Sequence, residues 1–339
     1  MSKTDQGPTD EAMTAALIRM GALPAAARPR ITALTGGVSS DIRLVELDGR
    51  RLCVKRALPQ LKVAQLWEAP IERNRYEWAW FELVAGICPS AAPGLIAHDP
   101  AAGLFVMAYL APGTHPLWKQ LLRGGVAESA VAASVGERLV RIHGATADRP
   151  DIAARFPTDA SFHAIRLEPY LIAAGRVHPD RAAALDALVA RTARTKRVLV
   201  HGDVSPKNIL IGPQGPIFLD AECAWYGDPA FDLAFCLNHL LLKCLWTRPA
   251  AARFLACFEA LAEAYLGGVA WEPRAAVEAR AAHLLPGLLL ARVDGKSPVE
   301  YLTADADKDL VRQLARKLLV EPVETLAGLR TSWAKEIGL

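Results

Sequence analysis

The sequence predicts an α+β protein with two parts, a small antiparallel sheet followed by a larger helical region. Short runs of alternating apolar and polar residues fill residues 28–110, and Asp48–Gly49 separates two of them with a strong hairpin signal. After Pro112–Gly113 the pattern changes to Ala-, Leu- and Arg-rich segments with helical spacing. Two short β-like runs interrupt these helices between residues 198 and 223.

The first part, residues 1–110, is expected to form one lobe. It begins with a predicted helix over residues 9–22, where Thr9 can act as the N-cap and acidic residues follow. Strands are then expected from the runs ARPRITAL, DIRLVEL, RLCVKRA, GLIAHD and GLFVMAYL. One long helix is predicted between the third and fourth runs, at residues 71–86, and the loop TGGVSSD lies between the first two strands.

The second part, residues 111–339, is predicted to be a helical lobe that follows a short connector at residues 107–113. Its helices are expected over residues 115–123, 127–147, 160–174, 179–195, 229–246, 249–267, 273–292, 305–318 and 322–335. The short runs VLVHGD–NILIG and PIFLDAE stand between the fourth and fifth of these helices.

Composition limits the possible functions. The 339 residues are 52% apolar and 22% charged, which is typical of a globular protein, and the net charge of +3 without a dense basic patch argues against nucleic-acid binding. No signal-peptide core or membrane-spanning apolar run is present. The six cysteines lack metal-site spacing, which indicates buried thiols in a reducing compartment. We therefore expect a soluble cytoplasmic protein, whose oligomeric state is not readable from the sequence.

The stretch VLVHGDVSPKNILIGPQGPIFLDAEC, residues 198–223, carries the strongest chemical signal. It places Asp203 five residues before Asn208, and Asp220 follows after a turn rich in Gly and Pro. Two carboxylates and an amide oxygen suit a hard cation such as Mg²⁺. Phosphoryl transfer needs this combination, because one residue orients the nucleophile while metal ions neutralise the phosphates.

HGDVSPKN followed by FLDAE resembles the catalytic and metal-binding segments of the aminoglycoside phosphotransferase and choline kinase family, whose members are small-molecule kinases with a protein-kinase-like, bilobal fold. The resemblance implies that Asp203 is the catalytic base and that Asn208 and Asp220 are Mg²⁺ ligands. It also implies that His201 braces the catalytic loop. Asp232, in GDPAFDLA, then holds the backbone amides of that loop.

The same resemblance extends upstream to the nucleotide. TGGVSSD resembles the loop that covers the nucleotide phosphates, and its phosphate-binding candidates are Gly36, Gly37, Ser39 and Ser40. Lys55, in LCVKRA, resembles the strand lysine that contacts the α- and β-phosphates of ATP or GTP.

Lys55 then requires a glutamate partner from the helix at residues 71–86. Glu77 is the preferred candidate because RNRYEWAWFEL has the usual pattern of that helix, and Glu72 stays open as an alternative. The connector VMAYLAPG resembles the kinase hinge. It implies Met107 behind the adenine pocket, with the Ala108 carbonyl and the Leu110 N–H binding the adenine edge.

Departures from protein kinases favour a small hydroxylated acceptor over a protein. Ser205 replaces the usual lysine, Asp220–Ala221–Glu222 replaces the DFG triplet, and no activation loop is evident. Segments 114–121 and 288–302 are the expected acceptor-lining regions. The acceptor-binding candidates are Trp118, Glu222, Arg292, Asp294 and Lys296. The mixed charge of segment 288–302 suits a polar or zwitterionic acceptor; the alternative is a capped helix–helix turn with solvated charges.

The sequence therefore predicts an ATP- or GTP-dependent phosphotransferase that moves the γ-phosphoryl group to a hydroxyl of an unidentified small molecule. One alternative is a catalytically silent nucleotide-binding module. Others are a protein kinase and an aminoglycoside or macrolide resistance kinase. The chain lacks the dense acidic run that a polycationic aminoglycoside would favour, and the sequence alone does not bring its aromatic residues together as a choline cage.

Overall fold

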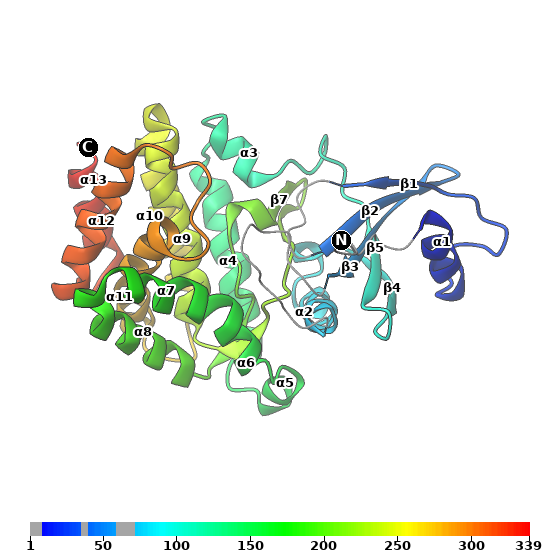
Figure 1. Ribbon diagram of the computed structural model, residues 1–339, viewed down its shortest axis with the longest axis horizontal. Coiled ribbons are helices and arrows are strands. Elements are labelled where there is room, and N and C mark those ends of the chain that lie inside the picture. Colours follow the sequence, from blue (N-terminus) through cyan, green and yellow to red (C-terminus); the bar gives the residue numbers. More distant parts are fainter. Residues whose placement is uncertain (1–8, 35–39, 59–71) are drawn as a thin grey trace, which may run out of the picture.

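The structure, a computed structural model, describes residues 9–34, 40–58 and 72–339. It has the predicted α+β fold, in which a sheet-bearing lobe at one end of the molecule adjoins a larger helical lobe (Figure 1). Gly36, Gly37 and Ser39 lie outside the described residues, so their predicted role in binding phosphate stays a prediction.

The sheet of the first lobe is antiparallel throughout and has the order β1-β2-β3-β5-β4. Its strands are β1 (Arg30–Ala33), β2 (Ser40–Leu47), β3 (Arg50–Ala57), β4 (Leu95–Asp99) and β5 (Leu104–Ala108). Asp48 and Gly49 both have positive φ, 48° and 79°, at the predicted hairpin turn between β2 and β3. Both residue types tolerate this conformation, which matches the twist of the flanking strands.

Helices cover both faces of this sheet, namely α1 (Asp10–Arg19) and α2 (Arg73–Ile87). Leu17 of α1 packs with Val54 of β3, whereas Phe81 of α2 packs with Cys53 on the opposite face. Because side chains alternate along a strand, Lys55 shares the α2 face with Cys53. The apolar run before Lys55 is thus a strand buried on both sides, which is why its alternation is hard to read from sequence.

The second lobe is helical, and its described residues include four short strands that form two two-stranded sheets. Its helices and strands are α3 (Trp118–Arg123), α4 (Ser129–Thr146), α5 (Pro150–Arg155), α6 (Asp159–Phe162), a π-helix (His163–Ile172), α7 (Ala173–Val177), α8 (Ala182–Arg194), β6 (Val198–Val200), β7 (Ile209–Gly212), β8 (Gly215–Phe218), β9 (Trp225–Gly227), α9 (Pro229–Trp246), α10 (Ala251–Gly267), α11 (Arg274–Asp294), α12 (Asp305–Val320) and α13 (Leu326–Glu336). β7 pairs with β8, and β6 pairs with β9.

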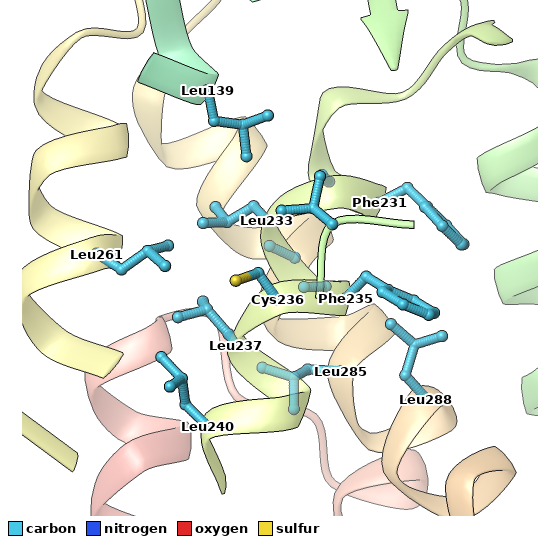
Figure 2. Packing of buried hydrophobic residues seen from close by; sticks show 14 of the residues in the cluster. Leu139, Phe231, Leu233, Phe235, Cys236, Leu237, Leu240, Leu261, Leu285 and Leu288 are labelled. Carbon is cyan, nitrogen blue, oxygen red and sulfur yellow. The ribbon is translucent and has the colours of Figure 1, made fainter. Parts of the chain in front are cut away.

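Helix α9 is the centre of the second lobe's core. Every side chain from Pro229 to Leu245 is buried. Leu233, Leu237 and Leu240 of α9 lie among leucines of α4, α10 and α11 (Figure 2). A helix that is apolar around nearly its whole circumference must be enclosed by other elements, so the few polar groups on α9 need a specific explanation.

Two features of this lobe depart from the sequence prediction. The helix expected at 160–174 contains a π-helical stretch around Pro169, because proline lacks an N–H donor and its ring crowds the preceding turn. Residues 225–227 form strand β9, which none of the predicted helices or strands covers. A strand of three residues is too short for the alternation of apolar and polar side chains to reveal it in the sequence.

The described part of the chain contains no helix that is both long and apolar enough to cross a membrane. All six cysteines are buried and carry free thiols, as the sequence predicts.

Candidate active site

The loop at residues 201–208 is fixed by a buried aspartate on the first turn of α9. Asp232 accepts hydrogen bonds from the N–H groups of His201 (2.7 Å) and Gly202 (2.8 Å). Its carboxylate is fully buried, and His143 of α4 lies 3.3 Å away. Asp232 therefore occupies the position expected of the residue that holds the loop amides.

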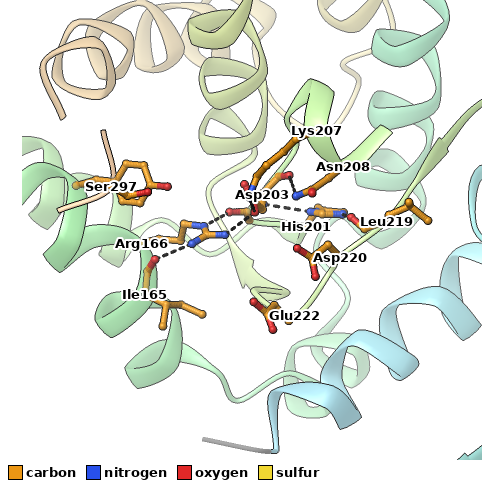
Figure 3. A network of polar contacts seen from close by, with 12 residues as sticks. Ile165, Arg166, His201, Asp203, Lys207, Asn208, Leu219, Asp220, Glu222 and Ser297 are labelled. Atoms are coloured by element: carbon orange, nitrogen blue, oxygen red, sulfur yellow. Dashed lines mark hydrogen bonds and ion pairs between the residues drawn. The ribbon is translucent and has the colours of Figure 1, made fainter. Parts of the chain in front are cut away.

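His201 braces the same loop from inside. Its Nδ1 accepts the N–H of Asp203 at 3.1 Å, and its Nε2 lies 3.0 Å from the carbonyl oxygen of Leu219 (Figure 3). Burial lowers the pKa of His201, despite the neighbouring carboxylates. A neutral ring satisfies both contacts, since one nitrogen then accepts and the other donates. His201 thus links the loop to the segment that leads into Asp220.

Asp203 lies between two cations, with one oxygen free. Its Oδ2 is 3.0 Å from Arg166 and 3.1 Å from Lys207, whereas its Oδ1 is buried without a hydrogen-bond partner among the described residues. Burial alone would raise the pKa of Asp203, but Lys207 and Arg166 hold it below its ordinary value. The carboxylate is therefore ionised, and its free oxygen can accept a hydrogen bond from a ligand.

Lys55, Glu77 and Asp220 join the two lobes. The ammonium of Lys55 lies 2.7 Å from Glu77 and also contacts Asp220. Glu72, the alternative partner, is exposed at the start of α2. Burial alone would lower the pKa of Lys55, but Asp220 and Glu77 raise it above its ordinary value. Lys55 is thus a fully charged cation with two carboxylate partners.

A cavity of about 390 Å³ opens beside these residues. It is lined from the sheet lobe by Ser40, Lys55 and Glu77, from the connector by Met107, Ala108 and Leu110, and from the helical lobe by Lys207, Asn208, Leu210 and Asp220. The N–H of Leu110 has no partner in the described ranges. The cavity combines an apolar end near the connector with a charged end, as a nucleotide requires.

Asn208 and Asp220 offer oxygen atoms to the charged end of this cavity. The amide nitrogen of Asn208 donates to the Asp203 carbonyl at 3.1 Å, which leaves the amide oxygen available. Asp220 adopts a positive φ of 64°, a strained conformation that asparagine and aspartate tolerate best. One carboxylate and one amide oxygen beside a phosphate-sized space fit a hard divalent cation that keeps some water.

Four of the five acceptor-binding candidates are buried in the core or paired with another side chain of the protein. Trp118 is 1% exposed within the hydrophobic core. Glu222 pairs with Arg73 of α2 at 2.8 Å, Asp294 with Arg312 at 2.7 Å, and Lys296 with Glu168 at 2.9 Å. Each of these charges is already neutralised by a protein partner, so the geometry favours structural roles for them.

Arg292 is the exception, and it lies close to residues that the sequence prediction missed. It is buried, and its Nη1 lies 3.3 Å from the hydroxyl of Tyr170 in the π-helix. Arg166, also in the π-helix, contacts Asp203 from a position far upstream in the sequence. No local pattern marks Arg166, whereas Lys207 stands within the recognised motif and could have been singled out from it.

Comparisons with known proteins show which sequences and folds this chain resembles. The model of the phosphotransferase enzyme family matches residues 30–243. Methylthioribose kinase 1 of Oryza sativa subsp. japonica is 24% identical over 269 residues, which cover 69% of this chain and 62% of that protein. The chain thus spans less than two thirds of the length of the curated relatives it matches.

Solved structures establish the protein-kinase-like fold. The choline kinase of Cryptosporidium parvum has a TM-score of 0.58 and 14% identity, with 95% of this chain and 99% of that chain covered. The macrolide 2′-phosphotransferase of Brachybacterium faecium has a TM-score of 0.51 and 18% identity, with 96% and 97% covered. Identities this low show a shared architecture and leave the substrate undetermined.

Proposed function

The chain belongs to the phosphotransferase enzyme family, and we propose that it transfers the γ-phosphoryl group of ATP or GTP to a hydroxyl group of a small molecule. The observation that carries this proposal is the environment of Asp203. One of its oxygens is held by two cations and the other is free, in a loop that also presents Asn208 to the cavity.

The nucleotide would occupy the cavity between the lobes. Its base would lie at the connector end, near Met107, with the Ala108 carbonyl and the Leu110 N–H at its edge. Its phosphates would lie toward Lys55, which Glu77 holds in place. Ser40 lines the same cavity, and Gly36, Gly37 and Ser39 of the preceding loop remain part of the proposal.

Asn208 and Asp220 would hold Mg²⁺, because their free oxygens face the phosphate end of the cavity. The ion would neutralise charge on the transferred and leaving phosphate groups. We also place the protein in the cytoplasm, where nucleotides are plentiful and its free thiols stay reduced.

Asp203 would orient the acceptor hydroxyl through its free Oδ1. As the hydroxyl oxygen bonds to the γ-phosphorus, the bond to the β,γ-bridging oxygen breaks and Asp203 receives the proton. Arg166 and Lys207 lower the pKa of Asp203, so it is a weak base. The transition state needs little proton transfer before the phosphorus bond breaks, and positioning therefore contributes most of the rate.

Thermal unfolding with and without Mg²⁺–ATP or Mg²⁺–GTP tests the nucleotide site. A ligand that binds only the folded state raises the midpoint by mass action. We expect a rise in wild type that shrinks in Asp220→Asn, a substitution that keeps a residue type suited to positive φ. Release of nucleoside diphosphate with a panel of alcohols then tests transfer.

The alternatives predict different results from the same measurements. A catalytically silent module would bind nucleotide but release no diphosphate with any alcohol. A protein kinase would label peptides instead. If neither nucleotide shifts the midpoint, the proposed function is wrong at its first step.

A further inference from the structure

Lys243 of α9 is a buried cation without an acidic partner. Its residue is 1% exposed, and no carboxylate lies within ion-pair distance of it in the part of the chain that the structure describes. Its ammonium instead lies 4.6 Å from the ring centre of Trp246 and 4.5 Å from that of Tyr301. These two rings stack on each other at 4.5 Å. Aromatic faces compensate a buried charge only in part.

The polar groups around Lys243 are also incompletely satisfied. Buried atoms without a hydrogen-bond partner include Nε2 of His239, Nε of Arg292 and the hydroxyl of Tyr301. His239 stands one turn before Lys243 on the same face of α9. Donors left unpaired in the interior are costly, and several close together indicate that a ligand completes their hydrogen bonds.

The groups around Lys243 carry more positive than negative charge. Lys119 and Arg292 act on Lys243 from α3 and α11, and the nearby carboxylate of Glu300 is already bound to Lys119. Burial and these cations lower the pKa of Lys243 to about 7, against the opposing effect of Glu300. Burial and the same surroundings lower the pKa of His239. We call Lys119, His239, Lys243 and Arg292 the cationic cluster.

The cationic cluster adjoins the catalytic loop. Tyr170 contacts Arg292 on one side, and the guanidinium of Arg166 lies 5.8 Å from its ring centre. Arg166 in turn lies 3.0 Å from Asp203. Ser297, whose carbonyl accepts from Arg292, appears beyond Arg166 in the network around Asp203 (Figure 3). A continuous series of contacts therefore joins the reacting carboxylate to the cluster.

Helix α9 sets the distance between the two places. Asp232 fixes its first turn to the loop amide next to Asp203, and His239 and Lys243 follow on later turns. With the rise of an α-helix, they lie on the order of 10 to 16 Å from that first turn. Because side chains on a helix lean toward its N-terminus, those of His239 and Lys243 shorten this separation. An extended acceptor the size of a sugar phosphate is the length that could present a hydroxyl to Asp203 and another group to the cluster.

We propose that the cationic cluster binds an anionic group, a carboxylate or a phosphate, on the acceptor molecule. This inference rests on the proposed function, because it assigns the acceptor of that reaction. An anion would supply the missing charge for Lys243 and accept hydrogen bonds from His239 and Arg292. Cationic acceptors such as aminoglycosides or choline would meet like charges, so the cluster selects against them.

Anion binding can be measured without turnover. We would compare unfolding midpoints in inorganic phosphate, acetate and chloride at equal ionic strength, for wild type and Lys243→Met. Lys317→Met is the matched control, since Lys317 is exposed on α12 and makes no ion pair within the described ranges. It also corrects for general salt effects on stability.

We expect phosphate or acetate to stabilise wild type and Lys317→Met, with an apparent Kd about tenfold weaker in Lys243→Met. The anion with the larger effect identifies the phosphate or carboxylate class. Lys243→Arg, which keeps the charge, should retain most of the binding. Equal anion effects in wild type and Lys243→Met would overturn the proposal.

A turnover assay is the second test of the proposed anion site. With Mg²⁺–ATP, we expect ribose 5-phosphate or gluconate to release more diphosphate than ribose or glucose, and only the anionic probes to lose about tenfold in kcat/KM in Lys243→Met. Preference for neutral or cationic alcohols would refute the anionic class while leaving the kinase function intact. Anion binding without transfer to any probe would instead weaken the proposed function.

Discussion

Two buried lysines distinguish the side proposed to bind the nucleotide, the nucleotide side, from the side proposed to bind the acceptor, the acceptor side. Lys55 is 3% exposed and Lys243 is 1% exposed, so burial penalises the charge of both. Lys55 has Glu77 and Asp220 as partners, and its pKa is raised. Lys243 has two aromatic rings and other cations beside it, and its pKa falls to about 7 against the opposing effect of Glu300, which is paired with Lys119.

The difference teaches that burial does not decide the charge of a lysine; its partners do. On the nucleotide side the protein supplies the opposite charges itself, so the site is electrostatically complete before a ligand arrives. On the acceptor side the protein leaves positive charge uncompensated. A ligand that carries the missing negative charge would gain the stabilisation that the folded protein lacks.

Asp203→Asn would remove the ionised carboxylate that lies between the two sides. We expect turnover to fall by about 10³-fold, within the range found for acid–base residues. The nucleotide-dependent rise in unfolding midpoint should persist, because Lys55 and Asp220 are unchanged. Turnover within tenfold of wild type would show that Asp203 is not the orienting base.

Lys55→Met would remove the cation that pairs with Glu77 and Asp220 on the nucleotide side. Glu77 would be left as a buried charge with no cation, and we expect a loss of about 3 kcal/mol in the free energy of unfolding. Urea denaturation at pH 7 measures this loss. Adding Glu77→Leu should recover part of it, since the orphaned carboxylate is then gone. A double variant no more stable than the single one would contradict this account.

Lys243→Met should raise the free energy of unfolding, whereas Lys55→Met should lower it. Since the pKa of Lys243 is about 7 when folded and 10.5 when unfolded, the unfolded state binds the extra proton between these values. Stability of the wild type should therefore rise with pH from about 7 toward 10. Without ligand, we expect the variant to be more stable by about 1–2 kcal/mol at pH 7.

Denaturant titrations from pH 7 to pH 10 test this prediction. The advantage of Lys243→Met should shrink as the pH rises toward 10.5, because the folded wild type has already released the proton that the unfolded chain still holds, and releasing it costs less as the pH nears the unfolded pKa. Lys317→Met provides the baseline for an exposed lysine. A variant less stable than wild type at pH 7 would mean that Lys243 has an unrecognised partner.

Lys119→Gln should produce the smallest effect. Lys119 and Glu300 form a partly exposed pair, and such pairs contribute about 0.2–1 kcal/mol. We expect a loss of less than about 0.5 kcal/mol in urea denaturation. A loss as large as that of Lys55→Met would show that the Lys119–Glu300 pair stabilises the fold as strongly as the buried Lys55–Glu77 pair.

The sequence predicted the fold and the order of its elements because the signals were local. The Asp48–Gly49 turn, the long helix before β4 and the apolar α9 each depend on neighbouring residues. The motif from His201 to Asp220 was recognisable for the same reason. Its catalytic roles stay predictions, although the contacts of Asp232 and His201 fit them.

The acceptor side could not be predicted because it depends on tertiary contacts. Arg166 comes from a π-helix, and Lys243 and His239 stand within an apolar helix where they read as isolated polar residues. The turn after α11 offered several charges, but only the partners in the folded chain show which are already neutralised. Asp294 and Lys296 are, whereas the Nε of Arg292 is not.

Helix α9 carries the loop-fixing aspartate, Asp232, on its first turn and two members of the cationic cluster, His239 and Lys243, on its later turns. Between these turns, Phe235 packs against Tyr170 and lies 5.9 Å from the guanidinium of Arg166. The loop amides of His201 and Gly202 donate to Asp232 and make no hydrogen bond to the later turns. If the proposed anion site is correct, changes at His239 and Lys243 would alter the preferred substrate while Asp232 keeps the catalytic loop in place, so that related enzymes would inherit the chemistry and differ in specificity.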